Sequence, residues 1–416
     1  INRMSTNSGL KEFFKSIKGD KMLWSVAALL AIFSFIPVYS ASSNLAYLNG
    51  ASGSTFAYLV KHFIHLVLGF SILYATHKIP YRYFRGLSII LLPVVIVLLI
   101  VTLLQGTTMQ GANASRWIQV PIVNFSFQTS TLASVVLLIY VARYLSKIKE
   151  SSYTFKETIV PLWLPVFLVV GLILPANFST AAIIFTTVLM LTFIGGYTFK
   201  YTAAIVGVGL LGLVLFGLSA KAFPDLFPNR VDTWISRVES FTQDEESKEQ
   251  YQVEKAKIAI ATGGITGNGI GKSVQRNFLP QSSSDFIYAI IVEEMGMVGG
   301  VGVILAYLFM LYRMAIIVTK SETTYGRLLV IAAGIPIIFQ AFINIAVAVE
   351  FFPVTGQTLP LVGSGGTSIW MTCLALGIVI SVSAKNEVRE KADAKQKAKD
   401  DDMAIENPLE VLSETI

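Results

Sequence analysis

FLPQSSSDFIYAIIVEEMGMVGG, residues 278–300, places three carboxylates at the start of an otherwise apolar helix. Asp285 stands where a loop becomes a helix, and Glu293 and Glu294 lie about two turns further on, at ~3.6 residues per turn. Ionisable groups at membrane depth are costly, so they are usually retained for a task. This stretch therefore predicts a functional site at the edge of a bilayer.

The composition of the whole chain favours a membrane setting for this helix. The 416 residues are 54% hydrophobic and only 14% charged, whereas soluble chains carry about 25% charged residues. An ordinary soluble protein is therefore excluded. The net charge of +6 is more typical of cytoplasmic loops and contact with anionic lipid headgroups than of nucleic-acid binding, so we expect no nucleic-acid partner.

Ten apolar runs approach the ~20 residues that a helix needs to cross a bilayer. They cover residues 23–42, 58–76, 86–104, 128–146, 160–176, 180–198, 201–219, 286–312, 328–348 and 366–384. The predicted fold is an all-α polytopic membrane protein with about ten transmembrane helices. One large extracytoplasmic loop, residues 220–284, is expected between helices 7 and 8.

The distribution of Lys and Arg predicts the orientation of the chain. These residues concentrate in alternate connections and in both tails, which places both termini in the cytoplasm. We accordingly divide the chain into an interfacial N-terminal segment, 1–22, a membrane domain, 23–384, and a cytoplasmic tail, 385–416.

Three segments on the predicted outer side, 111–128, 220–284 and 353–366, are too polar or too rich in Gly and Pro to be simple membrane helices. Within the second, GGITGNGIGKS ends like a phosphate-binding loop, but Thr266 occupies the position of the leading glycine of that motif. We therefore expect a glycine-bent surface or re-entrant loop there. All three segments are predicted to lie on the same, outer side of the membrane as Asp285. This arrangement indicates a site built from that face of the protein.

The residue pattern leaves alternatives open for the candidate site residues. Asp is a favoured helix N-cap, so Asp285 could either cap a helix or act as a catalytic carboxylate. Glu293 and Glu294 could hold helices together, and we favour that structural role for at least one of them. Arg116 beside Trp117 could be an interfacial anchor. The three histidines have no accompanying cysteine or further histidine group, so no metal site is predicted.

Several motifs, taken in order, resemble those of a known family. They are YSAS at 39–42, RWI at 116–118, NFSTA at 177–181, GGITGNG at 263–269, LP at 279–280, DFI at 285–287, EEMG at 293–296 and PVTGQTLPLVGSGGTS at 353–368. Their order and spacing resemble the SEDS family (shape, elongation, division and sporulation), from about residue 20 to residue 383. The resemblance is closer to the division-type branch than to the elongation-type branch.

The resemblance implies a peptidoglycan glycosyltransferase that polymerises lipid II, with Asp285 as the general base. In the implied reaction the 4-hydroxyl of an acceptor lipid II attacks the anomeric carbon of the growing glycan, and undecaprenyl pyrophosphate leaves with inversion. Positive charge for this leaving group could come from Arg116, Arg237, Lys272 or Arg276, with or without a divalent cation.

The resemblance also implies supporting roles for Gly264, Pro280 and Pro360, alongside Glu293 and Glu294. The implied partners are a class B penicillin-binding transpeptidase and other divisome proteins. The implied location is the bacterial cytoplasmic (inner) membrane, at the division septum.

Three positions outside the Asp285 element depart from the family pattern by losing a charge. The pattern QPSE followed by Lys appears as QTST at 128–131, with Ser134 in place of the Lys, and Asn177 replaces an Asp. In the element before Asp285, QSSS at 281–284 replaces EAHT, so Asp285 is its one carboxylate.

Other functions stay open on sequence grounds. A lipid II flippase or related transporter would use charges that line a path through the membrane, and few charges lie in the predicted spans. A scaffold that only activates its transpeptidase partner would tolerate substitution of Asp285. An elongation-type polymerase of the side wall is a further alternative.

Overall fold

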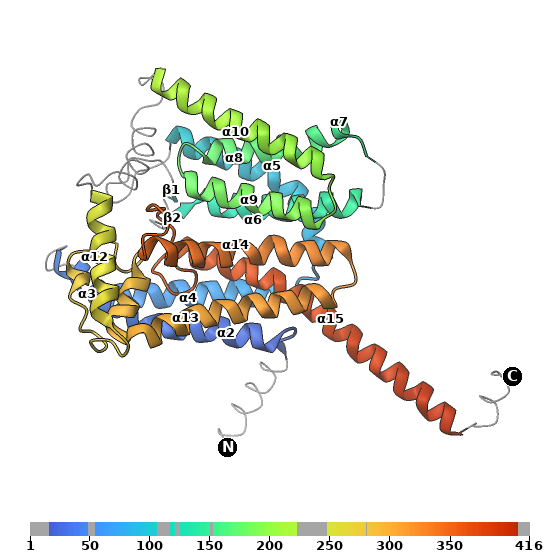
Figure 1. Ribbon diagram of the computed structural model, residues 1–416. Coiled ribbons are helices and arrows are strands. Elements are labelled where there is room, and N and C mark those ends of the chain that lie inside the picture. The colour runs from blue at the N-terminus through green and yellow to red at the C-terminus, as the bar shows by residue number, and fades with distance from the viewer. Residues whose placement is uncertain are drawn as a thin grey trace.

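The computed structural model describes residues 16–48, 55–105, 117–120, 125–149, 153–222, 248–279 and 281–406. Each of the ten expected spans is helical (Figure 1). In chain order the spans are α2 (Lys21–Phe33) with α3 (Phe35–Leu48), α4 (Thr55–Lys78), α5 (Arg82–Gln105), α6 (Thr129–Ile148), α7 (Phe155–Thr158) with η2 (Ile159–Trp163) and α8 (Leu164–Ile173), α9 (Phe178–Ile194), α10 (Phe199–Ala222), α13 (Ile287–Lys320), α14 (Thr324–Ala348) and α15 (Gly366–Glu406).

Within the described parts of the chain, nine helices are long and apolar enough to cross a membrane. The tenth, α9, is apolar but has only 17 residues. The prediction of an all-α polytopic membrane fold is therefore confirmed, with nine full-length spans and one short one.

Two of the spans are interrupted where the sequence contains proline. The first span divides at Ser34, between α2 and α3, three residues before Pro37. The fifth contains the π-helical turn η2, which includes Pro161. Proline lacks an N–H donor and its ring conflicts with the carbonyl four residues earlier, which favours a break. Pro93 of α5 and Pro336 of α14 nevertheless lie inside continuous helices.

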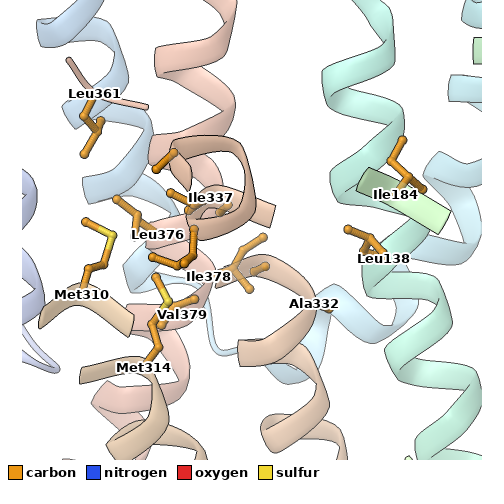
Figure 2. Packing of buried hydrophobic residues seen from close by; sticks show 14 of the residues in the cluster. Leu138, Ile184, Met310, Met314, Ala332, Ile337, Leu361, Leu376, Ile378 and Val379 are labelled. Carbon is orange, nitrogen blue, oxygen red and sulfur yellow. The ribbon is translucent and has the colours of Figure 1, made fainter. Parts of the chain in front are cut away.

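The helices form two neighbouring groups, one containing α2, α4, α13 and α15 and the other α5, α6, α8, α9 and α10 (Figure 1). Helix α14 joins them, because it packs against α6 and α9 as well as α13 and α15. Figure 2 shows the buried apolar side chains on both sides of α14. Met310 and Met314 of α13 lie near Val379 of α15, while Leu138 of α6 lies near Ile184 of α9.

One end of the bundle is held by polar contacts of the first described residues. The Asp20 carboxylate accepts a hydrogen bond from Leu23 N, 2.8 Å, and forms an ion pair with Arg313. Gly19 N donates to Glu387 Oε2, 3.0 Å. The start of α2, the later part of α13 and the extension of α15 therefore meet at this end, where α15 projects beyond the bundle (Figure 1).

The opposite end carries elements that the hydrophobic pattern did not predict. A two-stranded antiparallel hairpin pairs β1 (Trp117–Val120) with β2 (Phe125–Gln128). The predicted loop 220–284 contains a further helix, α12 (Lys248–Gly263), and a short 3-10 turn, η4 (Gln275–Asn277). As expected, none of the residues 351–365, all of which are described, is helical.

The predicted domain boundaries remain predictions. Helix α15 continues from the membrane-spanning part to Glu406 without a break at residue 385. Most of the predicted N-terminal segment, residues 1–15, lies outside the described residues.

The ion pair between Arg313 and Asp20 gives a stability prediction. The Asp20 side chain is only 6% exposed, so Arg313→Met would leave a largely buried carboxylate without its partner. The expected decrease in the free energy of unfolding lies between the ~1 kcal/mol of exposed ion pairs and the ~3–5 kcal/mol of buried ion pairs. Thermal unfolding of the purified protein would measure it.

The matched control is Arg389→Met. Arg389 pairs with Glu322 at 2.9 Å, but the Glu322 side chain is 67% exposed. The decrease in the free energy of unfolding should therefore be smaller for Arg389→Met than for Arg313→Met. Equal melting temperatures for the two variants would contradict the prediction.

Candidate active site

The candidate site is built beside a crossing of two backbones. The end of α12 and the turn after it, 263–269, lie directly against α13 around Gly296. Four backbone hydrogen bonds join the two segments: Asn268 N to Glu293 O at 2.9 Å, Gly269 N to Glu294 O at 3.0 Å, Met297 N to Gly264 O at 2.9 Å and Val298 N to Ile265 O at 3.3 Å.

Glycine is required at this crossing for steric reasons. A Cβ atom would lie 2.1 Å from Val292 O if added to Gly263, 2.2 Å from Glu294 O if added to Gly267, and 2.2 Å from Ile265 O if added to Gly296. Gly296 also has φ 67° and ψ −170° and interrupts α13, a backbone conformation that is essentially confined to glycine. The predicted motifs GGITGNG and EEMG thus form one structural unit.

Gly264 differs from the other glycines of this unit. Its φ is +54°, and an added Cβ would meet nothing within 4 Å. The position therefore favours glycine for backbone conformation and not for close approach. Its carbonyl accepts the bond from Met297 N.

The Glu293 carboxylate is surrounded by donors of the preceding segment. It is 1% exposed. Its Oε1 accepts hydrogen bonds from Val274 N, 2.8 Å, and Gln275 N, 3.2 Å, and its Oε2 accepts one from the Ser273 hydroxyl. Carboxylates that accept backbone N–H bonds at the start of a helical turn are well stabilised. Glu293 thereby fixes the segment that carries Arg276.

The Glu294 carboxylate binds the same segment and also α3. It is 2% exposed. Its Oε1 accepts hydrogen bonds from Ser273 N, 3.2 Å, and from the Ser40 hydroxyl. Nη1 of Arg276 donates to Ser40 Oγ, 2.8 Å. Arg276 is therefore held against α3, while Lys272 is exposed beside it.

Asp285 lies on a turn, residues 281–286, immediately before α13. It is 8% exposed, and its neighbour Phe286 is completely buried. Asp285 N donates to Gln281 O, 3.1 Å, and Asp285 O accepts from Nδ2 of Asn344, 2.8 Å. The N-cap position of α13 belongs to Phe286, whose side chain makes no capping hydrogen bond.

The Pro- and Gly-rich segment 353–366 packs against this turn. Ser364 N donates to Ser283 O, 2.8 Å, and the Ser364 hydroxyl donates to the same carbonyl, 2.9 Å. The Tyr307 hydroxyl of α13 donates to Pro360 O. The next residue, Leu361, is 1% exposed and has φ +64°, a strained conformation for a residue with a side chain.

The remaining predicted residues divide into two groups. Arg116, Arg237 and Pro280 lie outside the described residues. Thr131 and Ser134, two of the departures from the family pattern, line a cavity of about 70 Å³ between α6, α9, α14 and α15. Among the described residues, no three His, Cys, Asp or Glu side chains are grouped as a metal site would require.

Sequence reasoning missed the residues that hold the site together. Ser40 and Ser273 lie within the quoted motifs YSAS and GGITGNGIGKS but were given no role in the site, and Asn344 was not singled out, although each binds a predicted site residue. One signal was available. Gln340 and Asn344 are polar and four residues apart in the otherwise apolar helix α14, so they lie on one face of that helix.

Comparison with known proteins identifies the family. Residues 20–388 match the family model FTSW_RODA_SPOVE, described as a cell cycle protein. The chain belongs to this family. The predicted resemblance to SEDS proteins is therefore confirmed.

Curated members of the family are similar over nearly their whole length. The probable peptidoglycan glycosyltransferase FtsW of Marinomonas mediterranea is 28% identical, over 94% of this chain and 96% of that protein. The protein of the same name from Idiomarina loihiensis is 31% identical, over 87% of this chain and 86% of its own length.

Solved structures share the fold. A chain of a structure described as "Structural coordination of polymerization and crosslinking by a peptidoglycan synthase complex" has a TM-score of 0.66 and 24% identity, with 88% of this chain and 98% of that chain covered. The rod shape determining protein RodA of Thermus thermophilus has a TM-score of 0.63 and 23% identity, with 88% of this chain and 97% of RodA covered.

The glycine crossing gives the second prediction. Gly296→Ala would place a methyl group against Ile265 O and force a positive φ on alanine, so we expect a large loss of thermal stability and of folded protein. The strained backbone and the steric overlap each reduce the free energy of unfolding by ~1–3 kcal/mol, and together by more.

Gly302→Ala is the matched control on the same helix. An added Cβ there meets nothing within 4 Å, and alanine favours a helix over glycine by about 1 kcal/mol. The control should melt at or above the wild-type temperature. A Gly296→Ala protein that melts with the control would refute the steric argument.

Proposed function

We propose that this protein polymerises lipid II into glycan strands, with Asp285 as the general base. The observation that carries the proposal is the difference between the three carboxylate residues of 278–300. Glu293 and Glu294 bind backbone amides and hydroxyls of neighbouring segments. Asp285 lies on a turn that Asn344 of α14 and Ser364 of segment 353–366 hold in place.

The coarse function follows from family membership. The protein is a peptidoglycan glycosyltransferase with a multi-pass membrane fold. Its curated relatives are named FtsW, which supports a role in cell division at the septum of the bacterial inner membrane in preference to the elongation-type role.

The proposed reaction is an inverting displacement at a sugar carbon. The 4-hydroxyl oxygen of the acceptor lipid II forms a bond to the anomeric carbon of the growing glycan. The bond from that carbon to the pyrophosphate oxygen breaks, and undecaprenyl pyrophosphate leaves with the bonding electrons. Asp285 takes the proton of the attacking hydroxyl. This transfer prevents the build-up of positive charge on the 4-hydroxyl oxygen of the acceptor.

The leaving pyrophosphate requires positive charge nearby. Lys272 is exposed and adjoins the segment held by Glu293, and Arg276 lies four residues further on. Both flank residues 273–275, whose backbone amides bind the Glu293 and Glu294 carboxylates of α13. Arg116 and Arg237 remain candidates for the same role.

A class B penicillin-binding transpeptidase is the proposed partner. Support comes from the similarity to a chain of a peptidoglycan synthase complex, whose printed description couples polymerisation and crosslinking. Other divisome proteins are proposed on the division-type similarity alone.

The third prediction tests the base. Asp285→Asn keeps the side chain's size but cannot accept the proton, so polymerisation of purified lipid II should fall by about 10²–10⁴-fold with an unchanged melting temperature. Gel analysis of the glycan products measures the rate.

Glu293→Gln is the comparison variant for this experiment. It weakens the hydrogen bonds to Val274 and Gln275, so stability and activity should fall together. An active Asp285→Asn protein would overturn the proposed base. A wild-type protein that makes no polymer, alone or with its transpeptidase, would favour the flippase or scaffold alternatives.

The fourth prediction concerns Lys272. Removing its charge in Lys272→Ala should raise KM for lipid II several-fold, because a cation that meets the pyrophosphate contributes to substrate binding. The effect should shrink at high salt as the charges are screened. Lys255→Ala, on the neighbouring helix α12, serves as control, and equal KM values for the two variants would remove Lys272 from the site.

A further inference from the structure

Asn344, near the end of α14, connects the Asp285 turn to the Pro- and Gly-rich segment. The residue is 1% exposed. Its Nδ2 donates one hydrogen bond to Asp285 O, 2.8 Å, and the other to Gln357 O, 2.7 Å. Both hydrogens of the amide nitrogen are therefore used. One side chain thus fixes two carbonyl groups that are 72 residues apart in the sequence, since 357 − 285 = 72.

The orientation of the Asn344 amide follows from these contacts. Turning the amide over would place Oδ1 against two carbonyl oxygens at 2.7–2.8 Å, which would be repulsive, so the nitrogen must face them. Oδ1 is then buried and accepts no hydrogen bond from any described residue. An unsatisfied buried acceptor is unfavourable, so the amide has a structural cost at this position.

Gln340, one turn earlier on the same face of α14, makes a similar bond without reaching Asp285. Its Nε2 donates to Thr358 O, 2.8 Å. The two amides of α14 therefore bind consecutive carbonyls of the segment 353–366. Of these two amides, only Asn344 also binds the turn that carries the proposed base. A comparison of the two residues therefore separates the effect of holding the segment 353–366 from the effect of holding Asp285.

We propose that Asn344 is a positioning residue for Asp285. By fixing the Asp285 carbonyl, it restricts the backbone from which the carboxylate projects, and by fixing Gln357 it holds that turn against α14. Small displacements of a reacting group reduce rates steeply, by ~10²-fold for about 1 Å. This inference rests on the proposed role of Asp285 as the base.

The test compares Asn344→Leu with Gln340→Leu in the full-length protein, with purified lipid II as substrate. Both variants replace an amide by an apolar side chain of similar size and leave carbonyls of the same segment without a donor, so both should lose some thermal stability. We expect kcat to fall about 10–100-fold in Asn344→Leu with KM within about 3-fold of wild type. In Gln340→Leu, kcat should stay within about 3-fold of wild type.

A double-mutant cycle separates positioning from general weakening of the structure. In Asp285→Glu the carboxylate is already displaced by one methylene group, so adding Asn344→Leu should reduce kcat by less than about 3-fold. Multiplicative losses in the double variant would overturn the proposal, and so would equal losses of kcat in Asn344→Leu and Gln340→Leu.

Failure of the inference and failure of the proposed function give different results. If Asp285→Asn is inactive while Asn344→Leu keeps wild-type kcat, Asn344 does not position the base, and the base assignment stands. If Asp285→Asn is active, both proposals fall. If Asn344→Leu cannot be purified folded, Asn344→Ser, which keeps a single donor, replaces it in the same comparison and should show a kcat between those of wild type and a strongly impaired variant; wild-type kcat would overturn the proposal.

Discussion

The contact of two backbones at Gly263, Gly267 and Gly296 is the constraint on which the candidate site depends. Each glycine lies where a side chain would collide with a carbonyl oxygen of the other segment. Without this close approach, α12 could not lie on α13, and residues 273–275 could not reach the carboxylates of Glu293 and Glu294. The break in α13 at Gly296 is thus part of the same arrangement that brings basic residues to this end of the bundle.

Three carboxylate residues of similar chemistry occupy different environments at this end. Glu293 and Glu294 each accept hydrogen bonds from the backbone of the segment before Asp285, and such bonds make a carboxylate an efficient way to fix a turn. The backbone of Asp285 is held by Gln281 and Asn344. These contacts fix the backbone from which the Asp285 carboxylate projects, and a fixed backbone favours a defined position for a reacting group.

Hydrophobic length predicted the spans well because a bilayer demands a minimum apolar length. The expectation that the Pro- and Gly-rich segment 353–366 is not helical throughout is confirmed, since α15 begins only at Gly366. Helix α12 was missed because it packs through small residues, Ala256, Ala259 and Gly263, which give a weak apolar signal. The strands of the hairpin have four residues each, too few for an alternating pattern to be recognised. The contact between Asn344 and Asp285 could not be predicted from the sequence, since it depends on how two helices pack.

Thr131, Ser134 and Asn177, three of the departures from the family pattern, lie together around one uncharged network. Thr131 and Ser134 line the cavity that Thr180 and Gln357 also line. Gln357 donates to Thr180 Oγ1, 2.9 Å, and Asn177 caps α9 by accepting from Thr180 N, a role that Asn performs about as well as Asp. Neutral amides and hydroxyls bind carbonyls inside a membrane without the desolvation cost of a charge. The loss of three charges therefore leaves a network that can still connect α9 to the segment on which Asn344 and Asp285 depend.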